Sequence, residues 1–262
     1  MESRYAQEVS KYGKKDGIAA FCVCIGITVL VLADMAINNM ISAPWYVMGL
    51  ISIVRCSLAV VGVIIVVKVN KKSLSSIGLH KSNLGKAIGL GFLFGLIPIT
   101  FFAVVPGVIS GFAQVNLGIL FTLVMTFFYA AHEDVVFVGF VQTRLYGLFK
   151  THRAAICVGA ILFAAMHVPP WLLTGQLDLG QPLVIIQTFL GWAAIHFVFV
   201  SVFKKYFSLV PVFILHTLWG FSSHFAQAWT IDFSLIVGAV AVSAACFLYW
   251  QSYRKEKLSS QQ

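Results

Sequence analysis

Charged residues are scarce in this sequence of 262 residues. Only 10% of them are Asp, Glu, Lys or Arg, whereas 60% are hydrophobic and the mean hydropathy is +0.92. Because ordinary soluble domains contain about 25% charged residues, this composition excludes a water-soluble globular protein. So much apolar surface can be buried only by lipid and by helices that pack on one another.

The long apolar runs also lack the period-two alternation of apolar and polar residues that lipid-facing strands show, which excludes a transmembrane β-barrel. A helix needs about 20 apolar residues to cross about 30 Å of hydrocarbon. Roughly eight runs approach this length: about residues 18–33, 45–67, 87–109, 116–140, 154–173, 182–203, 209–229 and 231–250. We therefore predict an all-α fold, a polytopic transmembrane helical bundle with about eight spans.

Lys and Arg are absent from every second gap between these runs. They occur before the first run, in the second, fourth and sixth gaps, and after the last run. The remaining gaps hold Asn38, Asn39, Asp178 and Asp232 instead. Since Lys and Arg stay preferentially on the cytoplasmic side of a membrane protein, we expect both termini to be cytoplasmic.

The same pattern gives the domain organisation. We expect residues 1–16 to form a basic cytoplasmic segment, residues 17–250 a single transmembrane bundle, and residues 251–262 a cytoplasmic tail. The net charge of +9 then follows from topology, and anionic lipid headgroups are its expected partners. Nucleic acid is not needed to explain the charge.

A few ionisable residues lie inside the runs, where a functional or paired role is the default interpretation because charge is costly there. Arg55 is the one basic residue inside a run, and Glu133 and Asp134 are the only acids that we place deep in the membrane. Four side chains lie 11 to 14 residues from a basic residue of a cytoplasmic gap: Arg55, Glu133, His167 and His216. At ~1.5 Å per residue these separations are about 16–21 Å, so we expect one polar layer near the middle of the membrane.

This layer combines a carboxylate and two imidazoles in a medium of low dielectric constant. Glu133 could act as a general base that takes a proton from water. His167 and His216 could share that water, donate a proton to a leaving amine, or stabilise the oxyanion of a tetrahedral intermediate. Hydrolysis of an amide is the reaction class that these groups would serve.

Three stretches carry a family resemblance: EDVVFVGF at residues 133–140, FAAMH at 163–167 and HTLWGF at 216–221. They resemble the E-E-x-x-x-R, F-x-x-x-H and H-x-x-x-N motifs of the CAAX protease and bacteriocin-processing family, also called the ABI family. The motifs match in order and spacing over a core of about residues 117–229. The resemblance implies a glutamate-dependent intramembrane endopeptidase on an all-helical bundle.

By this resemblance, Glu133 would activate water together with His167, and His216 would help to hold the oxyanion. A metal ion is not securely implied. The zinc pattern H-E-x-x-H begins at His132 but has Val136 where the second His must stand. Glu133, His167 and His216 could still hold Zn²⁺ with an open position for water.

The sequence departs from the family pattern at three positions. Asp134 stands in place of the second Glu, Val138 replaces the motif Arg, and Gly220 replaces the Asn that partners the oxyanion histidine. Loss of one oxyanion donor costs about 10²–10³ in rate in other proteases. As a replacement for the missing guanidinium, we hypothesise that Arg55 pairs with Asp134 across helices. Candidates for the missing amide are the hydroxyls of Ser222 and Ser223 and a backbone N–H near Gly220.

We assign no catalytic or metal-binding role to His132, His196, His224 or the cysteines. His132 precedes Glu133 and need not face the same cavity, since successive helical side chains point about 100° apart. We interpret His196 and His224 as structural. The five cysteines lie in apolar runs and show neither a disulfide framework nor a metal-ligand spacing.

Three classes of function stay open. The first is an endopeptidase that cleaves a membrane-associated peptide or lipidated protein, in peptide maturation or bacteriocin self-immunity, as the family implies for a bacterial cell membrane. The second is a catalytically impaired scaffold or regulator of a membrane partner protein. The third is a transporter, which ranks last because broken paired helices and inverted repeats are not evident.

Overall fold

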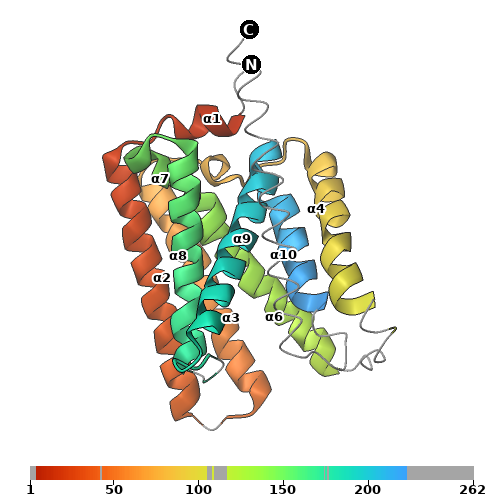
Figure 1. Ribbon diagram of the computed structural model, residues 1–262. Helices are drawn as coiled ribbons and strands as arrows, with labels where there is room; N and C mark the ends of the chain where they lie inside the picture. The colour runs from red at the N-terminus through yellow and green to blue at the C-terminus, as the bar shows by residue number, and fades with distance from the viewer. Residues whose placement is uncertain are drawn as a thin grey trace.

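The computed structural model describes residues 4–222, apart from residues 42, 105–107, 109–116, 174 and 176. Within this part of the chain the regular elements are helices, and no strand is formed (Figure 1). The prediction of an all-α fold is therefore confirmed. The predicted eighth run at 231–250, Ser223, His224, Asp232 and the tail at 251–262 lie outside the described residues. The number of spans and the cytoplasmic location of the termini stay predictions.

Five of the described helices are long and apolar enough to cross a membrane. They are α2 (Lys14–Met40), α3 (Trp45–Val69), the continuous helix Leu117–Phe149, α8 (His152–Leu173) and α9 (Pro182–Tyr206). Two shorter apolar helices, α4 (Leu84–Ile99) and α10 (Val210–Ser222), pack against one another. The remaining short helices are α1 (Arg4–Val9), η1 (Leu74–Ile77) and η2 (Thr100–Val104). Large side chains such as Val29, Leu58 and Leu93 stay exposed, as a lipid-facing surface requires.

The first span is longer than the sequence predicted. α2 runs past residue 33 to Met40, so that Asp34 lies within the helix and is only 8% exposed. Its Oδ2 accepts hydrogen bonds from Arg55 Nε and Ser52 Oγ of α3, both at 3.0 Å. Asp34 is therefore a third buried acid beside Glu133 and Asp134, and a partner on the next helix compensates its charge. The depth of these acids in the membrane stays a prediction.

The helix Leu117–Phe149 changes its geometry in the middle. It consists of α6 (Leu117–Glu133), the π-helix η3 (Asp134–Val141) and α7 (Gln142–Phe149). All eight residues of η3 are buried. A π-helix bonds each residue to the fifth one along and so widens the turn, and such segments occur frequently at functional sites. Here the widened turn begins directly after Glu133.

Close packing of α4 against α10 fixes the helix that carries His216. Gly91 of α4 faces the backbone of Pro211, and a Cβ at this glycine would lie 2.9 Å from the Pro211 carbonyl oxygen. Any side chain at Gly91 would therefore push the two helices apart. In Figure 1, α4 and α10 stand beside α9, on the opposite side of the bundle from α2.

The N-terminal segment packs on one end of the bundle. α1 lies across that end (Figure 1), in contact with α7 and α9. Tyr5 is buried there and meets Phe203 and Phe207 edge-on at centroid distances of 6.0 and 6.1 Å. The region predicted as a basic cytoplasmic segment thus contributes side chains to the core of this end.

Candidate active site

Glu133 lies at the junction of α6 and η3, where α8 and α10 come close to it. Its Oε2 is 3.5 Å from His167 Nε2 and 3.8 Å from His216 Nε2. The structure therefore brings together the three residues that the motifs singled out. Among the described residues, Oε2 has no hydrogen-bond partner although it is buried. Buried polar atoms are rarely left in this state, and a water molecule is the usual partner where protein supplies none.

The orientation of His167 follows from its other nitrogen. His167 Nδ1 is 2.8 Å from the carbonyl oxygen of Phe163, one turn earlier on α8. A carbonyl can only accept, so Nδ1 carries the proton in the neutral ring and Nε2 is left with a lone pair. The ring also stacks on Trp192 of α9 at a centroid distance of 3.8 Å and an interplanar angle of 16°. These two contacts hold the lone pair toward Glu133.

Asp134 orients His216 in the same way. Its Oδ1 is 3.0 Å from His216 Nδ1, so Nδ1–H donates to the carboxylate and Nε2 points toward Glu133. Asp134 is fully buried. Because η3 is wider than an α-helix, successive side chains diverge by less than about 100°. Neighbouring acids can therefore reach the two nitrogens of one ring.

These orientations place acceptors opposite acceptors. With neutral rings and an ionised carboxylate, the lone pairs of His167 Nε2 and His216 Nε2 face Glu133 Oε2. A water molecule resolves this conflict, because its two O–H groups can donate to the carboxylate and to one imidazole at once. The Glu133 site, comprising Glu133, Asp134, His167 and His216, is thus arranged to hold and polarise water.

Arg55 does not join this site. Its Nε pairs with Asp34 Oδ2 at 3.0 Å, and its guanidinium carbon lies 5.5 Å from the ring centroid of Tyr129. The hypothesis that Arg55 pairs with Asp134 is therefore wrong, because α2 offers a nearer carboxylate and His216 occupies Asp134. We call the ion pair of Asp34 and Arg55, together with the hydroxyl of Ser52 beside it, the Arg55 pair. A predicted first span that extended past residue 33 would have included Asp34 and revealed this pair.

Gly220 has a packing reason to be glycine. It lies one turn after His216 on α10, and a Cβ at this position would be 2.6 Å from Thr126 Cγ2 on α6. The Asn of the family motif would therefore require α6 or α10 to shift. The candidate substitute Ser222 donates its hydroxyl to the Trp219 carbonyl oxygen at 2.8 Å, and Ser223 lies outside the described residues. Val138, in place of the motif Arg, is fully buried in η3.

The two other described histidines inside the bundle have local partners. His132 Nδ1 is 3.1 Å from the Tyr129 carbonyl oxygen and 3.7 Å from Cys56 Sγ. His196 Nε2 is 3.1 Å from Gln142 Oε1, and its ring stacks on Phe163. Sequence reasoning did not find Trp192 or Gln142, since neither belongs to a motif or carries a charge.

The side chains do not fit a metal centre as they stand. Within the described part of the chain, no group of three or more His, Cys, Asp or Glu side chains could hold a metal ion. At Glu133, the two imidazole Nε2 atoms lie 3.5 and 3.8 Å from the same carboxylate oxygen. A reaction at this site therefore relies on water and these side chains.

Comparison with known proteins adds one match. Residues 113–222 match the family model described as type II CAAX prenyl endopeptidase Rce1-like. The matched segment contains Glu133, His167 and His216, and it supports the family predicted from the three motifs. None of the curated proteins matches the chain.

Proposed function

We propose that this membrane protein, whose residues 113–222 match the family model of Rce1-like CAAX prenyl endopeptidases, is a glutamate-dependent endopeptidase that hydrolyses an amide bond. One observation carries the proposal. The buried, unpartnered Oε2 of Glu133 lies between the Nε2 atoms of His167 and His216, which come from two other helices. Three separate helices converge on one atom that lacks a partner among the described residues.

The proposed reaction begins with a water molecule that donates to Glu133 Oε2 and His167 Nε2. Glu133 takes one proton as general base while the water oxygen adds to the carbonyl carbon of the scissile amide. The carbonyl oxygen becomes an oxyanion. When the tetrahedral intermediate collapses, the C–N bond breaks and the proton held by Glu133 passes to the leaving amine. One water is consumed, and an acid and an amine are released.

His216 is proposed to stabilise the oxyanion. Asp134 accepts from its Nδ1, which aims Nε2 at the reaction centre. When the neutral ring takes up a second proton from solvent, its Nε2–H becomes a charged donor, and charged donors at a developing oxyanion are among the strongest contributions to catalysis. In this role Asp134 is a positioning residue.

The proposed substrate is a membrane-associated peptide or a lipidated protein. The helices around the site keep apolar faces exposed, so a substrate that approaches from lipid suits this architecture better than a soluble peptide. We propose peptide maturation or bacteriocin self-immunity in a bacterial cell membrane as the setting, with both chain termini cytoplasmic. The expected partners are membrane lipid and this substrate.

Glu133→Gln tests the proposal, because it preserves size and removes the base. Peptides and lipidated proteins would be compared between membranes of cells that carry the wild-type chain, Glu133→Gln or the matched control Glu8→Gln. We expect uncleaved species to accumulate only with Glu133→Gln, at equal membrane levels of the three proteins. Identical peptide profiles would exclude the endopeptidase.

The alternative is a catalytically impaired scaffold that binds a membrane partner protein. The observation in its favour is the clash that the motif Asn would meet at position 220, where its Cβ would lie 2.6 Å from Thr126 Cγ2. A phenotype of the null strain that Glu133→Gln fully rescues would favour the scaffold over the enzyme.

A further inference from the structure

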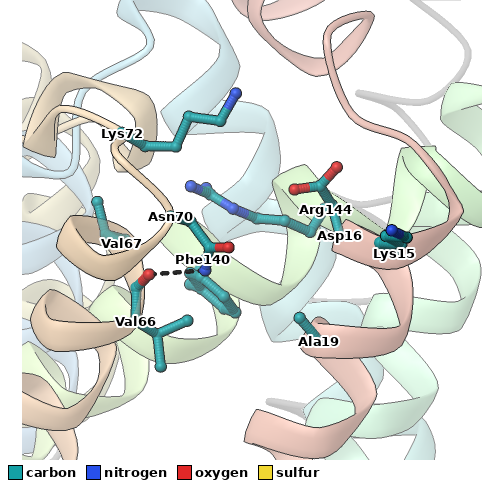
Figure 2. Close-up of a pocket in the computed structure, with 9 residues that line it drawn as sticks. All are labelled: Lys15, Asp16, Ala19, Val66, Val67, Asn70, Lys72, Phe140 and Arg144. Carbon is teal, nitrogen blue, oxygen red and sulfur yellow. Dashed lines mark hydrogen bonds between the residues drawn. The ribbon is translucent and has the colours of Figure 1, made fainter.

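A small cavity lies at the end of the bundle that carries α1. It is bounded by the start of α2, the end of α3 and the helix formed by η3 and α7 (Figure 2). Its volume is about 70 Å³. Because a water molecule needs about 10–15 Å³ of such volume, the cavity has room for roughly five to seven waters. This is room for a tetrahedral oxyanion and too little for a peptide segment.

The polar side chains around the cavity are mostly cationic. Lys15, Lys72 and Arg144 line it together with Asn70, and Asp16 is the one acid among the lining residues. Figure 2 shows the Arg144 side chain extending across the cavity toward Asn70 and Lys72 on the α3 side. Three cations and one carboxylate around so small a space favour an anion as its occupant.

Arg144 is the unusual member of this group. It is only 3% exposed, and a buried guanidinium is normally paired with a carboxylate. Here no described carboxylate forms an ion pair with it. Its hydrogen bonds go to neutral acceptors: Ser76 O at 3.0 Å, Ser76 Oγ at 2.9 Å, Thr143 Oγ1 at 2.7 Å and Gly139 O at 3.4 Å. The rings of Tyr12 and Phe140 flank its guanidinium carbon at 4.5 and 4.6 Å.

The nearby acids Asp16 and Glu8 interact electrostatically with Arg144, but their hydrogen bonds go to other groups. Asp16 Oδ2 accepts from the Gly13 backbone N–H at 2.9 Å, at the start of α2. Glu8 accepts from Lys11 at 2.7 Å and from Tyr12 at 2.8 Å. Burial tends to raise the pKa of Glu8, but these two hydrogen bonds and nearby positive charge outweigh it and lower the pKa. Burial raises the pKa of Tyr12, so its phenol stays neutral and supplies no negative charge.

We propose that this cavity binds a phosphate group, with Arg144 at its base and Lys15 and Lys72 at its rim. Guanidinium and ammonium groups recognise phosphate oxygens through charge-assisted hydrogen bonds. The phosphate could belong to an anionic lipid headgroup or be free phosphate. Both sources present the same oxyanion to the cavity, and the test below separates them.

The test measures binding to the full-length protein in neutral detergent micelles. Short-chain phosphatidylglycerol, short-chain phosphatidylcholine and inorganic phosphate would each be titrated at constant ionic strength, with the unfolding temperature as readout. We expect phosphatidylglycerol or inorganic phosphate to raise the unfolding temperature saturably. A response to phosphatidylglycerol alone assigns the site to a headgroup, whereas an equal response to inorganic phosphate assigns it to the free ion.

Two double variants with the same change of net charge decide where the anion binds. Lys15→Gln with Lys72→Gln alters the rim, and Lys14→Gln with Lys71→Gln alters the adjacent exposed lysines that do not line the cavity. We expect the rim variant to bind at least about tenfold more weakly, the loss of one charge-assisted contact, and the control within about twofold of wild type.

Equal weakening in both double variants would overturn the proposal, since it would indicate a diffuse basic surface. No saturable response of the wild-type protein to any of the ligands would overturn it as well. Because the readout is stability and not hydrolysis, the result is independent of the proposed endopeptidase activity. Arg144→Lys is a further variant, which keeps the charge and removes the planar fork, and we expect it to weaken binding.

Discussion

The Arg55 pair and the Glu133 site both place ionisable side chains inside the bundle, and they do so in opposite ways. In the Arg55 pair, the guanidinium of Arg55 and the hydroxyl of Ser52 both donate to one carboxylate oxygen of Asp34, at 3.0 Å. In the Glu133 site, the carboxylate oxygen faces two imidazole nitrogens at 3.5 and 3.8 Å without a hydrogen bond. The first arrangement joins a carboxylate to a cation and a hydroxyl of the protein, while the second carboxylate oxygen, Asp34 Oδ1, has no partner among the described residues. The second leaves a carboxylate oxygen without a cation or a donor, at the place where we propose that water binds.

The difference shows what separates a structural polar cluster from a reactive one in an apolar bundle. Burial alone does not, since both clusters are buried. A charge matched by its opposite stabilises the arrangement of two helices, and removal of one partner leaves the other uncompensated. A carboxylate held among acceptors stays in place only because other contacts, such as the stack of His167 on Trp192, hold the rings. Mutations in the two clusters should therefore affect different measurements.

The largest expected effect separates two histidines on neighbouring helices. His167→Gln removes a nitrogen that faces Glu133 and should lower kcat by about 10²–10⁴. His196→Gln removes a ring whose hydrogen bond goes to Gln142, so it should lower stability by about 1–3 kcal/mol and leave kcat within a few-fold. Rates of substrate cleavage in liposomes, together with denaturant unfolding, measure both. Equal losses of kcat in the two variants would contradict the distinction.

The second prediction concerns the Arg55 pair. Arg55→Leu leaves Asp34 buried without its cation and should destabilise the protein by about 3–5 kcal/mol. The double variant Asp34→Asn with Arg55→Leu removes both charges and should recover most of this loss. Cleavage per folded molecule should change little in either variant, because the pair does not contact Glu133. Denaturant unfolding in micelles measures the stability of both variants, and cleavage rates normalised to folded protein measure their activity. If the double variant did not recover stability, the two residues would not act as a unit.

Much of the bundle could be predicted from the sequence because apolar length and basic gaps are properties of single runs. The convergence of Glu133, His167 and His216 was also predictable, since counting from the basic gaps placed them at one depth and their motifs fell in separate runs. The pairing of Asp34 with Arg55 was not predicted. The predicted first run ends at residue 33, one residue before the acid, because a carboxylate at the edge of an apolar run resembles a loop residue.

Local geometry was beyond sequence reasoning for a different reason. Nothing in the letters of residues 134–141 distinguishes a π-helix from an α-helix, yet the wider turn allows Asp134 and Glu133 to face the same ring. The close approach of α10 to α6 likewise depends on tertiary packing. From the sequence alone, Gly220 is interpreted as the loss of the motif Asn, and its contact with Thr126 is not predicted. Both features depend on helix geometry and on packing between helices, and the hydrophobicity of one apolar run does not determine either.

The orienting role of Asp134 gives the third prediction. Asp134→Asn replaces a charged acceptor of His216 Nδ1–H with an amide that can also donate, so the ring can turn over or change tautomer. A hydrogen bond to a charged group contributes about 1.5–3 kcal/mol, so kcat should fall about 10–100-fold while KM stays nearly constant. Asp134→Glu should restore part of the rate, since the family motif carries Glu here. Steady-state kinetics in liposomes test this; an unchanged kcat would remove Asp134 from the mechanism.

The smallest expected effect tests whether the departure at Gly220 is a matter of space. Gly220→Asn alone should destabilise the protein by about 1–3 kcal/mol, because its Cβ would lie 2.6 Å from Thr126 Cγ2. Thr126→Ser removes that methyl group and keeps the hydroxyl that donates to the Thr122 carbonyl oxygen. The double variant should therefore unfold close to the wild-type midpoint. If the Asn side chain then reaches the oxyanion, kcat of the double variant should rise above that of Thr126→Ser alone. Recovered stability with an unchanged kcat would mean that His216 already stabilises the oxyanion without an amide.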